Sequence, residues 1–136
     1  MLQPARPAIA VVMIVGTNRA NAQGVLDALR RQSCADDLLE IVVFDCADAS
    51  VPALQMPVRF CGKHIHRPGL HFWRVARAQA AKESSAPVVA FLENHCEPLQ
   101  VMEYLLHSKP RREGWKLFQC VEAQTKHTNI SLFWPL

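Results

Sequence analysis

The sequence predicts an α/β fold in which a mostly parallel sheet is flanked by helices. Three apolar runs rich in Val and Ile, Ala8 to Val15, Leu39 to Phe44 and Val88 to Leu92, have the pattern of strands buried on both faces. Segments with helical periodicity separate them, and this alternation favours parallel strands joined by right-handed crossovers. The 136 residues fit one domain, 1–136, with little room for a second.

The first half of the chain is expected to contain one helix between two strands. After the first strand stops at Gly16, the segment Asn21 to Gln32 is amphipathic, with Asn21 as the expected N-cap. The second strand, Leu39 to Phe44, ends at Asp45. A short strand is expected at Val58 to Phe60, after a loop flanked by prolines.

The second half predicts two further helices. His71 to Lys82 can form a helix that turns Val75, Ala76, Gln79 and Ala80 toward the sheet, and Pro87 then opens the strand Val88 to Leu92. Pro98 is expected to start a third helix that ends near His107. Trp115 to Val121 is a strand candidate, whereas residues 125–136 favour no single element.

Composition excludes several classes of protein. The hydrophobic share of 50% and the charged share of 20% are those of a folded globule. The net charge of +3 comes from dispersed residues, which predicts no nucleic-acid partner but leaves a small anionic ligand open. The longest apolar run is far shorter than the ~20 residues of a membrane span, and no secretory signal is evident. Five widely spaced cysteines suit reduced thiols, so a cytoplasmic location is expected.

Polar clusters follow three of the predicted strands. They are Thr17 to Arg19, Asp45 with Asp48, and Glu93 to His95. Ligands of parallel α/β sheets bind at the carboxyl ends of the strands, so the three clusters predict a site at one edge of the sheet. The glycine-rich dinucleotide fingerprint is missing after the first strand, and no Gly-Lys-Ser or Gly-Lys-Thr occurs. Neither an NAD site nor a P-loop is therefore predicted.

Four segments in order resemble the family 2 glycosyltransferases. They are Ala-Val-Val-Met-Ile-Val-Gly-Thr-Asn-Arg at 10–19, Leu-Arg-Arg-Gln-Ser at 29–33, Glu-Ile-Val-Val-Phe-Asp at 40–45 and Val-Ala-Phe-Leu-Glu-Asn-His-Cys-Glu-Pro at 89–98. The resemblance covers roughly residues 8–108. It implies a GT-A fold and a nucleotide-diphospho-sugar ligand, with a UDP-sugar expected.

The same resemblance implies roles for five residues. Thr17 and Asn18 occupy the loop that approaches the nucleoside, and Asp45 matches the acidic residue that binds the base. Glu93 and His95 take the first and third places of the family's Asp-x-Asp motif, which contacts the ribose and a divalent metal, Mn²⁺ or Mg²⁺. Such an ion neutralises the diphosphate leaving group as the sugar bond breaks.

The chain departs from the family pattern at important positions. His95 replaces a carboxylate, and imidazole suits Mn²⁺ or Zn²⁺ better than Mg²⁺. Ala78 stands where the family usually has Asn. The stretch after His95 is too short for the family's acceptor-binding half, and no catalytic base is identified, although Glu113 and Glu122 are carboxylates there. A truncated, weakly active or inactive transferase domain is therefore expected.

Several alternatives stay open beside this interpretation. Asp45 could tie a turn, and the Glu93 loop could cap the helix that begins at Pro98. Gly69 and Arg77 are weaker candidates, since Arg77 could reach a phosphate or simply face solvent. A zinc site and a Cys96 nucleophile beside His95 are both disfavoured by spacing; the zinc ligands would be Cys61, His64, His66 and His71.

A non-catalytic assembly module is the competing function. A face left uncovered by a missing half would favour a homo-oligomer, and a few C-terminal apolar residues could cover it, namely Phe133, Trp134 and Leu136.

Overall fold

The computed structural model describes residues 6–48, 50–93, 118–120 and 130–133, the last two ranges as strands. The elements run β1 (Ile9–Val15), α1 (Arg19–Arg30), β2 (Leu39–Asp45), β3 (Cys61–His66), α2 (Trp73–Lys82), β4 (Val88–Leu92), β5 (Phe118–Cys120) and β6 (Ile130–Phe133). They form one sheet in the order β3-β2-β1-β4-β6-β5. The first four strands are parallel, while β6 is antiparallel to β4 and to β5. The predicted α/β fold with a mostly parallel sheet is therefore confirmed.

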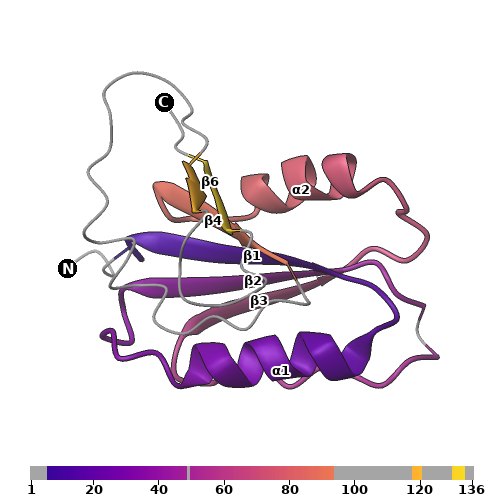
Figure 1. The fold of residues 1–136 in the computed structure, drawn as a ribbon, viewed down its shortest axis with the longest axis horizontal. Coiled ribbons are helices and arrows are strands. Elements are labelled where there is room, and N and C mark those ends of the chain that lie inside the picture. The colour runs from indigo at the N-terminus through magenta and orange to yellow at the C-terminus, as the bar shows by residue number, and fades with distance from the viewer. Residues whose placement is uncertain (1–5, 49, 94–117, 121–129, 134–136) are drawn as a thin grey trace, which may run out of the picture.

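The two helices in the described part of the chain cover opposite faces of the sheet (Figure 1). On the α1 face, Val25, Leu26 and Leu29 pack against the odd-numbered residues of β1 and β2 and the even-numbered residues of β4. On the α2 face, Ala76 and Ala80 pack on the alternate residues of the same strands. Successive side chains of a strand point to opposite faces, so strands covered on both sides are apolar throughout. This explains why β1, β2 and β4 were readable as continuous apolar runs.

The third strand lies later in the chain than expected. The prediction placed it at Val58 to Phe60, but β3 runs from Cys61 to His66 and pairs only with β2 within the described sheet. Val58 is 99% exposed. An edge strand is only half covered, so polar residues such as Lys63 are acceptable there and protect the open edge from pairing with other chains. Its sequence therefore contains no apolar run that would predict a strand.

Both described helices start elsewhere than the sequence suggested. Helix α1 begins at Arg19, and its N-cap is Asn18, whose side chain accepts a hydrogen bond from the amide of Asn21 at 3.2 Å. The expected cap at Asn21 was wrong by one helical turn. Helix α2 begins at Trp73, and Val75, expected to face the sheet, is 44% exposed.

In the second half, β4 matches its predicted range. Strand β5 lies within the predicted range Trp115 to Val121, and β6 falls where no element was expected. The helix expected from Pro98 to His107 lies outside the described residues. None of the helices in the described part of the chain has the length and apolar character that a bilayer crossing needs.

A buried carboxylate joins several segments at the amino edge of the sheet. Glu40 is fully buried on the α2 face of β2, and its Oε2 accepts hydrogen bonds from the Ser85 amide and from the hydroxyls of Ser84 and Ser85 at 2.9 to 3.2 Å. Lys63 Nζ lies 3.3 Å from its Oε1, at ion-pair distance but without hydrogen-bond geometry. Glu40 therefore ties β2 and β3 to the loop between α2 and β4.

Candidate functional site

The candidate site lies at the carboxyl edge of the parallel strands. In the register, Val15 at the end of β1 is level with Asp45 at the end of β2, which is level with His66 at the end of β3. Glu93 directly follows β4, whose Phe91 pairs with Val12. Figure 1 shows that both helices begin at this end of the sheet. The described residues of the predicted clusters therefore share one edge.

The loop after β1 exposes the side chains of Thr17 and Asn18. The Thr17 carbonyl accepts a hydrogen bond from the Arg19 amide at 2.9 Å, while Asn18 caps the helix. Amide groups of the first helical turn have no intrahelical partner, so a helix start is favourable for an anionic group. The loop can thus present hydroxyl and amide groups to a ligand.

Asp45 is buried, and protein groups occupy both of its carboxylate oxygens. Arg19 binds it in a bidentate manner, with Nη1 2.9 Å from Oδ1 and Nη2 2.8 Å from Oδ2. The Ala47 amide donates to Oδ1 at 3.1 Å, and His64 Nε2 lies 2.7 Å from Oδ2. Because a carboxylate only accepts, His64 carries its proton on Nε2 in this contact. Only 1% of the Asp45 side chain is exposed.

These contacts determine the ionisation of Asp45. Burial by itself would raise the pKa of this carboxyl group, but the hydrogen bonds from Arg19, His64 and the Ala47 amide outweigh it and hold the pKa below its ordinary value. A carboxylate has about four acceptor positions, and four donors are already present. Asp45 is therefore an ionised anchor for Arg19 and His64.

Glu93 lies on the other side of the sheet, next to α2. Its Oε1 is 3.8 Å from Nη2 of Arg77, an ion pair that is longer than a hydrogen bond. The Arg77 guanidinium also lies 4.3 Å from the centroid of the Trp73 ring and 5.1 Å from that of Phe91, within the range of cation–π contacts. Burial lowers the pKa of Arg77 and the neighbouring Glu93 partly offsets this.

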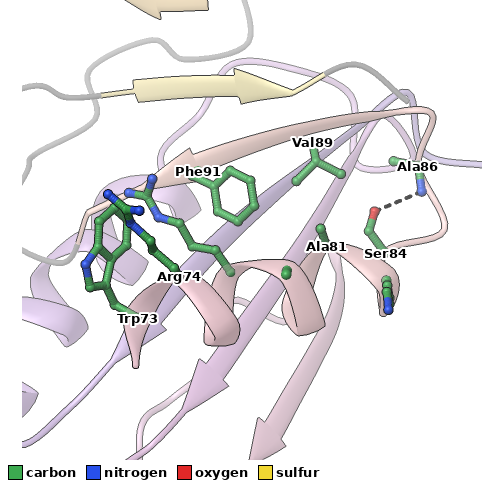
Figure 2. Close-up of a pocket in the computed structure, with 10 residues that line it drawn as sticks. Trp73, Arg74, Ala81, Ser84, Ala86, Val89 and Phe91 are labelled. Atoms are coloured by element: carbon green, nitrogen blue, oxygen red, sulfur yellow. Dashed lines mark hydrogen bonds between the residues drawn. The ribbon is translucent and has the colours of Figure 1, made fainter. Parts of the chain in front are cut away.

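Two adjoining cavities surround Arg77. The smaller has a volume of about 350 Å³, and Glu93 is the carboxylate that lines it, together with Val12, Ile14, Trp73, Arg77, Phe91 and Leu92. The larger, of about 710 Å³, extends along α2 between Trp73 and Ser84 and is floored by Val89 and Phe91 of β4 (Figure 2). A charged pair beside an apolar groove can orient a ligand whose remainder lies along the groove.

Comparison with known proteins is consistent with this architecture. No protein-family model and no curated protein sequence matches the chain. Among solved structures, a mannosyltransferase from Pyrobaculum calidifontis in complex with GDP-Man and Mn²⁺ superposes on 66% of this chain with a TM-score of 0.57 and 17% sequence identity. The described fold resembles part of a glycosyltransferase fold. The chain spans 28% of the length of that neighbour.

Within this fold, the predicted residues separate into two groups. Asp45 continues the set of β2 residues that face α1, and it contacts Arg19 of α1. Glu93 contacts Arg77 of α2, on the other face of the sheet. Thr17 and Asn18 lie at the end of β1, the strand between β2 and β4. His95, the second expected metal ligand, lies outside the described residues, as do Cys96, Glu113 and Glu122.

The histidines of β3 have structural partners in place of zinc. His64 contacts Asp45, and His66 Nε2 lies 2.6 Å from the Ala47 carbonyl oxygen. In the ranges that the structure describes, no three His, Cys, Asp or Glu side chains gather as metal ligands. Burial raises the pKa of the Cys34 and Cys46 thiols, which favours their neutral form.

The sequence indicated some of the residues that pack at the carboxyl edge without their contacts. Arg19 was visible in the first polar cluster and His64 only as a disfavoured zinc ligand. Their link to Asp45 spans 26 and 19 positions, and no local pattern reports such contacts. Trp73 was not singled out, although it stands four positions before Arg77 in α2, the spacing at which side chains on one helix meet.

Proposed function

We propose that this chain binds a nucleotide-diphospho-sugar at the carboxyl edge of its sheet and acts as the donor-binding domain of a glycosyltransferase. The observation that carries the proposal is Glu93 beside Arg77 in a cavity directly after β4, in a fold shared with a sugar transferase. A carboxylate and a guanidinium are the groups that handle a metal diphosphate, one through the cation and the other through the phosphate oxygens.

In this proposal the nucleoside lies over Thr17 and Asn18, next to Asp45. Because the Asp45 oxygens already accept four hydrogen bonds, we assign it an indirect role, which is to hold Arg19 and His64 in place. The family resemblance favours a UDP-sugar, whereas the structural neighbour was solved with GDP-Man. Both nucleotides therefore belong in the test.

The residues at this site could hold a hard divalent ion, but they supply only part of its ligands. Mg²⁺ and Mn²⁺ are held by one or two carboxylates together with substrate phosphates and water, so Glu93 can supply one ligand and the diphosphate others. We propose His95 as the second protein ligand. The ion would neutralise charge on the leaving diphosphate, while Arg77, positive at neutral pH, balances Glu93.

The experiment is calorimetric titration of UDP and of GDP, each with and without Mn²⁺. We expect Mn²⁺ to strengthen binding of one nucleotide, and Glu93→Gln to weaken the Mn²⁺-supported binding by at least about tenfold, the size expected for loss of one charge-assisted contact. His95→Ala should remove most of the dependence on the metal. Glu83→Gln, at the opposite end of α2, is the matched control.

Measurement of glycosyl transfer and donor hydrolysis separates an active transferase from a non-catalytic binding domain. The catalytic base and acceptor wall of the family are not identified in this chain, and general-base help contributes roughly 10²- to 10⁴-fold. We therefore expect nucleotide binding with negligible transfer or donor hydrolysis by the chain alone. Robust glycosyl transfer would overturn that expectation, and absence of binding to either nucleotide would overturn the proposed function itself.

A further inference from the structure

The start of α2 exposes an apolar cluster that extends beyond the proposed donor site. The side chains are Phe72, Trp73 and Val75, with exposed fractions of 74%, 55% and 44%. Phe72 is the N-cap residue of α2, and Trp73 and Val75 lie in its first turn. Soluble surfaces tolerate scattered apolar residues, but adjacent exposed aromatic residues at a helix start indicate an interaction surface.

The chain segment that contains this cluster carries only basic charges, some of which are paired with acidic residues elsewhere in the chain. From Ala49 to Lys82 the chain contains no Asp or Glu, and its basic residues are Arg59, Lys63, Arg67, Arg74, Arg77 and Lys82, with His64, His66 and His71. Arg67 precedes the apolar cluster in sequence, Arg74 lies between Trp73 and Val75, and both arginines are exposed. The nearest acidic group that the structure pairs with α2 is Glu93, which is engaged by Arg77.

We propose that the start of α2 binds the surface of an anionic lipid bilayer. Aromatic side chains favour the boundary between headgroups and acyl chains, and arginines beside them are attracted by anionic headgroups. A single-stranded nucleic acid would need a basic groove that tracks its backbone, whereas Lys and Arg residues are otherwise dispersed over the chain, with a net charge of only +3. The combination of exposed apolar residues with flanking arginines favours the lipid surface.

The surface also has a fixed position relative to the candidate site. Helix α2 starts at the carboxyl edge of the sheet, so Phe72 lies at the same end as Asp45 and Glu93 (Figure 1). Trp73 belongs to both regions, because it also lines the cavities around Arg77. Docking would place the opening of the candidate site close to the membrane.

The test is co-sedimentation of the whole chain with phosphatidylcholine vesicles that contain or lack phosphatidylglycerol. We expect binding only to the anionic vesicles, falling as salt rises. Phe72→Ser combined with Val75→Ser should lower the partition coefficient at least about tenfold, and Arg67→Gln with Arg74→Gln about fivefold for each arginine. Phe72→Trp should preserve binding, because Trp is also favoured at the bilayer surface.

The matched controls remove the same chemistry elsewhere. Val58→Ser removes an apolar side chain that is 99% exposed, and Arg31→Gln removes an exposed charge at the end of α1; neither should change binding. Equal binding of the Phe72/Val75 double variant and the parent chain would overturn the proposal. The proposal would also be overturned if the double variant kept vesicle binding and lost only a dimer, or only a complex with a single-stranded oligonucleotide. Nucleotide titration of the same variant shows whether its donor site is intact, so a loss of vesicle binding is not mistaken for a defect in that site.

Discussion

Arg19 connects three segments of the carboxyl edge. Its guanidinium binds both oxygens of Asp45, its Nε donates to the Pro52 carbonyl at 2.7 Å, and its Nη1 lies 3.5 Å from the Gly16 carbonyl. The end of β1, the end of β2 and the loop that follows are thereby held by one side chain. Planar bidentate pairing of this kind is specific to arginine, so a lysine could not reproduce it.

Replacing Arg19 should therefore destabilise the fold strongly. Arg19→Gln leaves a buried carboxylate without its main counter-charge, and loss of one partner of a buried ion pair costs about 3 kcal/mol or more. Urea denaturation of the variant measures this cost. Arg30→Gln is the control, because Arg30 is exposed and its 3.6 Å pair with Asp27 contributes little. Similar losses in the two variants would contradict the role assigned to Arg19.

The lowered pKa of Asp45 predicts an acid-sensitive contribution to stability. Its pKa is lower in the folded than in the unfolded chain, so the contribution is complete above the unfolded value of about 4 and disappears as pH falls through the folded value. The free energy of unfolding should thus differ between the parent and Asp45→Asn by a constant amount near neutrality. That difference should shrink below about pH 4. A difference independent of pH would contradict the ionised state of Asp45.

At the scale of elements, the turn between β3 and α2 sets where α2 begins. The Leu70 amide donates to the Arg67 carbonyl at 3.4 Å, and Gly69 has φ of +82°. Pro68 and Gly69 at the two central positions, with positive φ at the second, have the features of a type II turn. The turn reverses the chain after the edge strand, so that Phe72 and Trp73 emerge at the carboxyl edge.

Two glycine substitutions should have opposite effects. Gly69→Ala places a side chain in the left-handed region and should cost about 1 kcal/mol of stability, although no atom lies within 4 Å of the added Cβ. Gly24→Ala in α1, where the Cβ also meets nothing within 4 Å, should stabilise by up to about 1 kcal/mol. Thermal unfolding of both variants is the measurement, and equal signs would contradict the assigned conformations.

What the sequence could predict depends on how local its signal is. Strands β1, β2 and β4 are buried on both faces, so their apolar runs located them to within a residue. Strand β3 is an edge strand whose lysine and histidines are held by distant partners, Glu40, Asp45 and Ala47. Likewise the edge that carries Asp45 and Glu93 followed from parallel topology, but their pairing with Arg19 and Arg77 arises from tertiary packing alone.

At the scale of the whole molecule, the carboxylates at the two edges of the sheet have different surroundings. The amino edge contains the Glu40 network, which joins β2, β3 and the loop before β4. The carboxyl edge contains Glu93 and Arg77 in a cavity, with 31% of the Glu93 side chain exposed. A fully buried and hydrogen-bonded carboxylate supports the fold, whereas a partly exposed carboxylate in a cavity can meet a ligand.

This division predicts that two carboxylate substitutions will separate stability from binding. Glu40→Gln removes the charge that accepts hydrogen bonds from the Ser84–Ser85 loop and pairs with Lys63. It should therefore lower the free energy of unfolding by about 1.5 kcal/mol or more. The folded variant should keep the nucleotide affinity of the parent. Glu93→Gln should do the reverse, because its 3.8 Å contact with Arg77 contributes little to folding. Urea denaturation and nucleotide titration with Mn²⁺ on both variants measure the two quantities. Loss of stability without loss of binding in Glu93→Gln would assign Glu93 to the fold and leave the carboxyl edge without its proposed metal ligand.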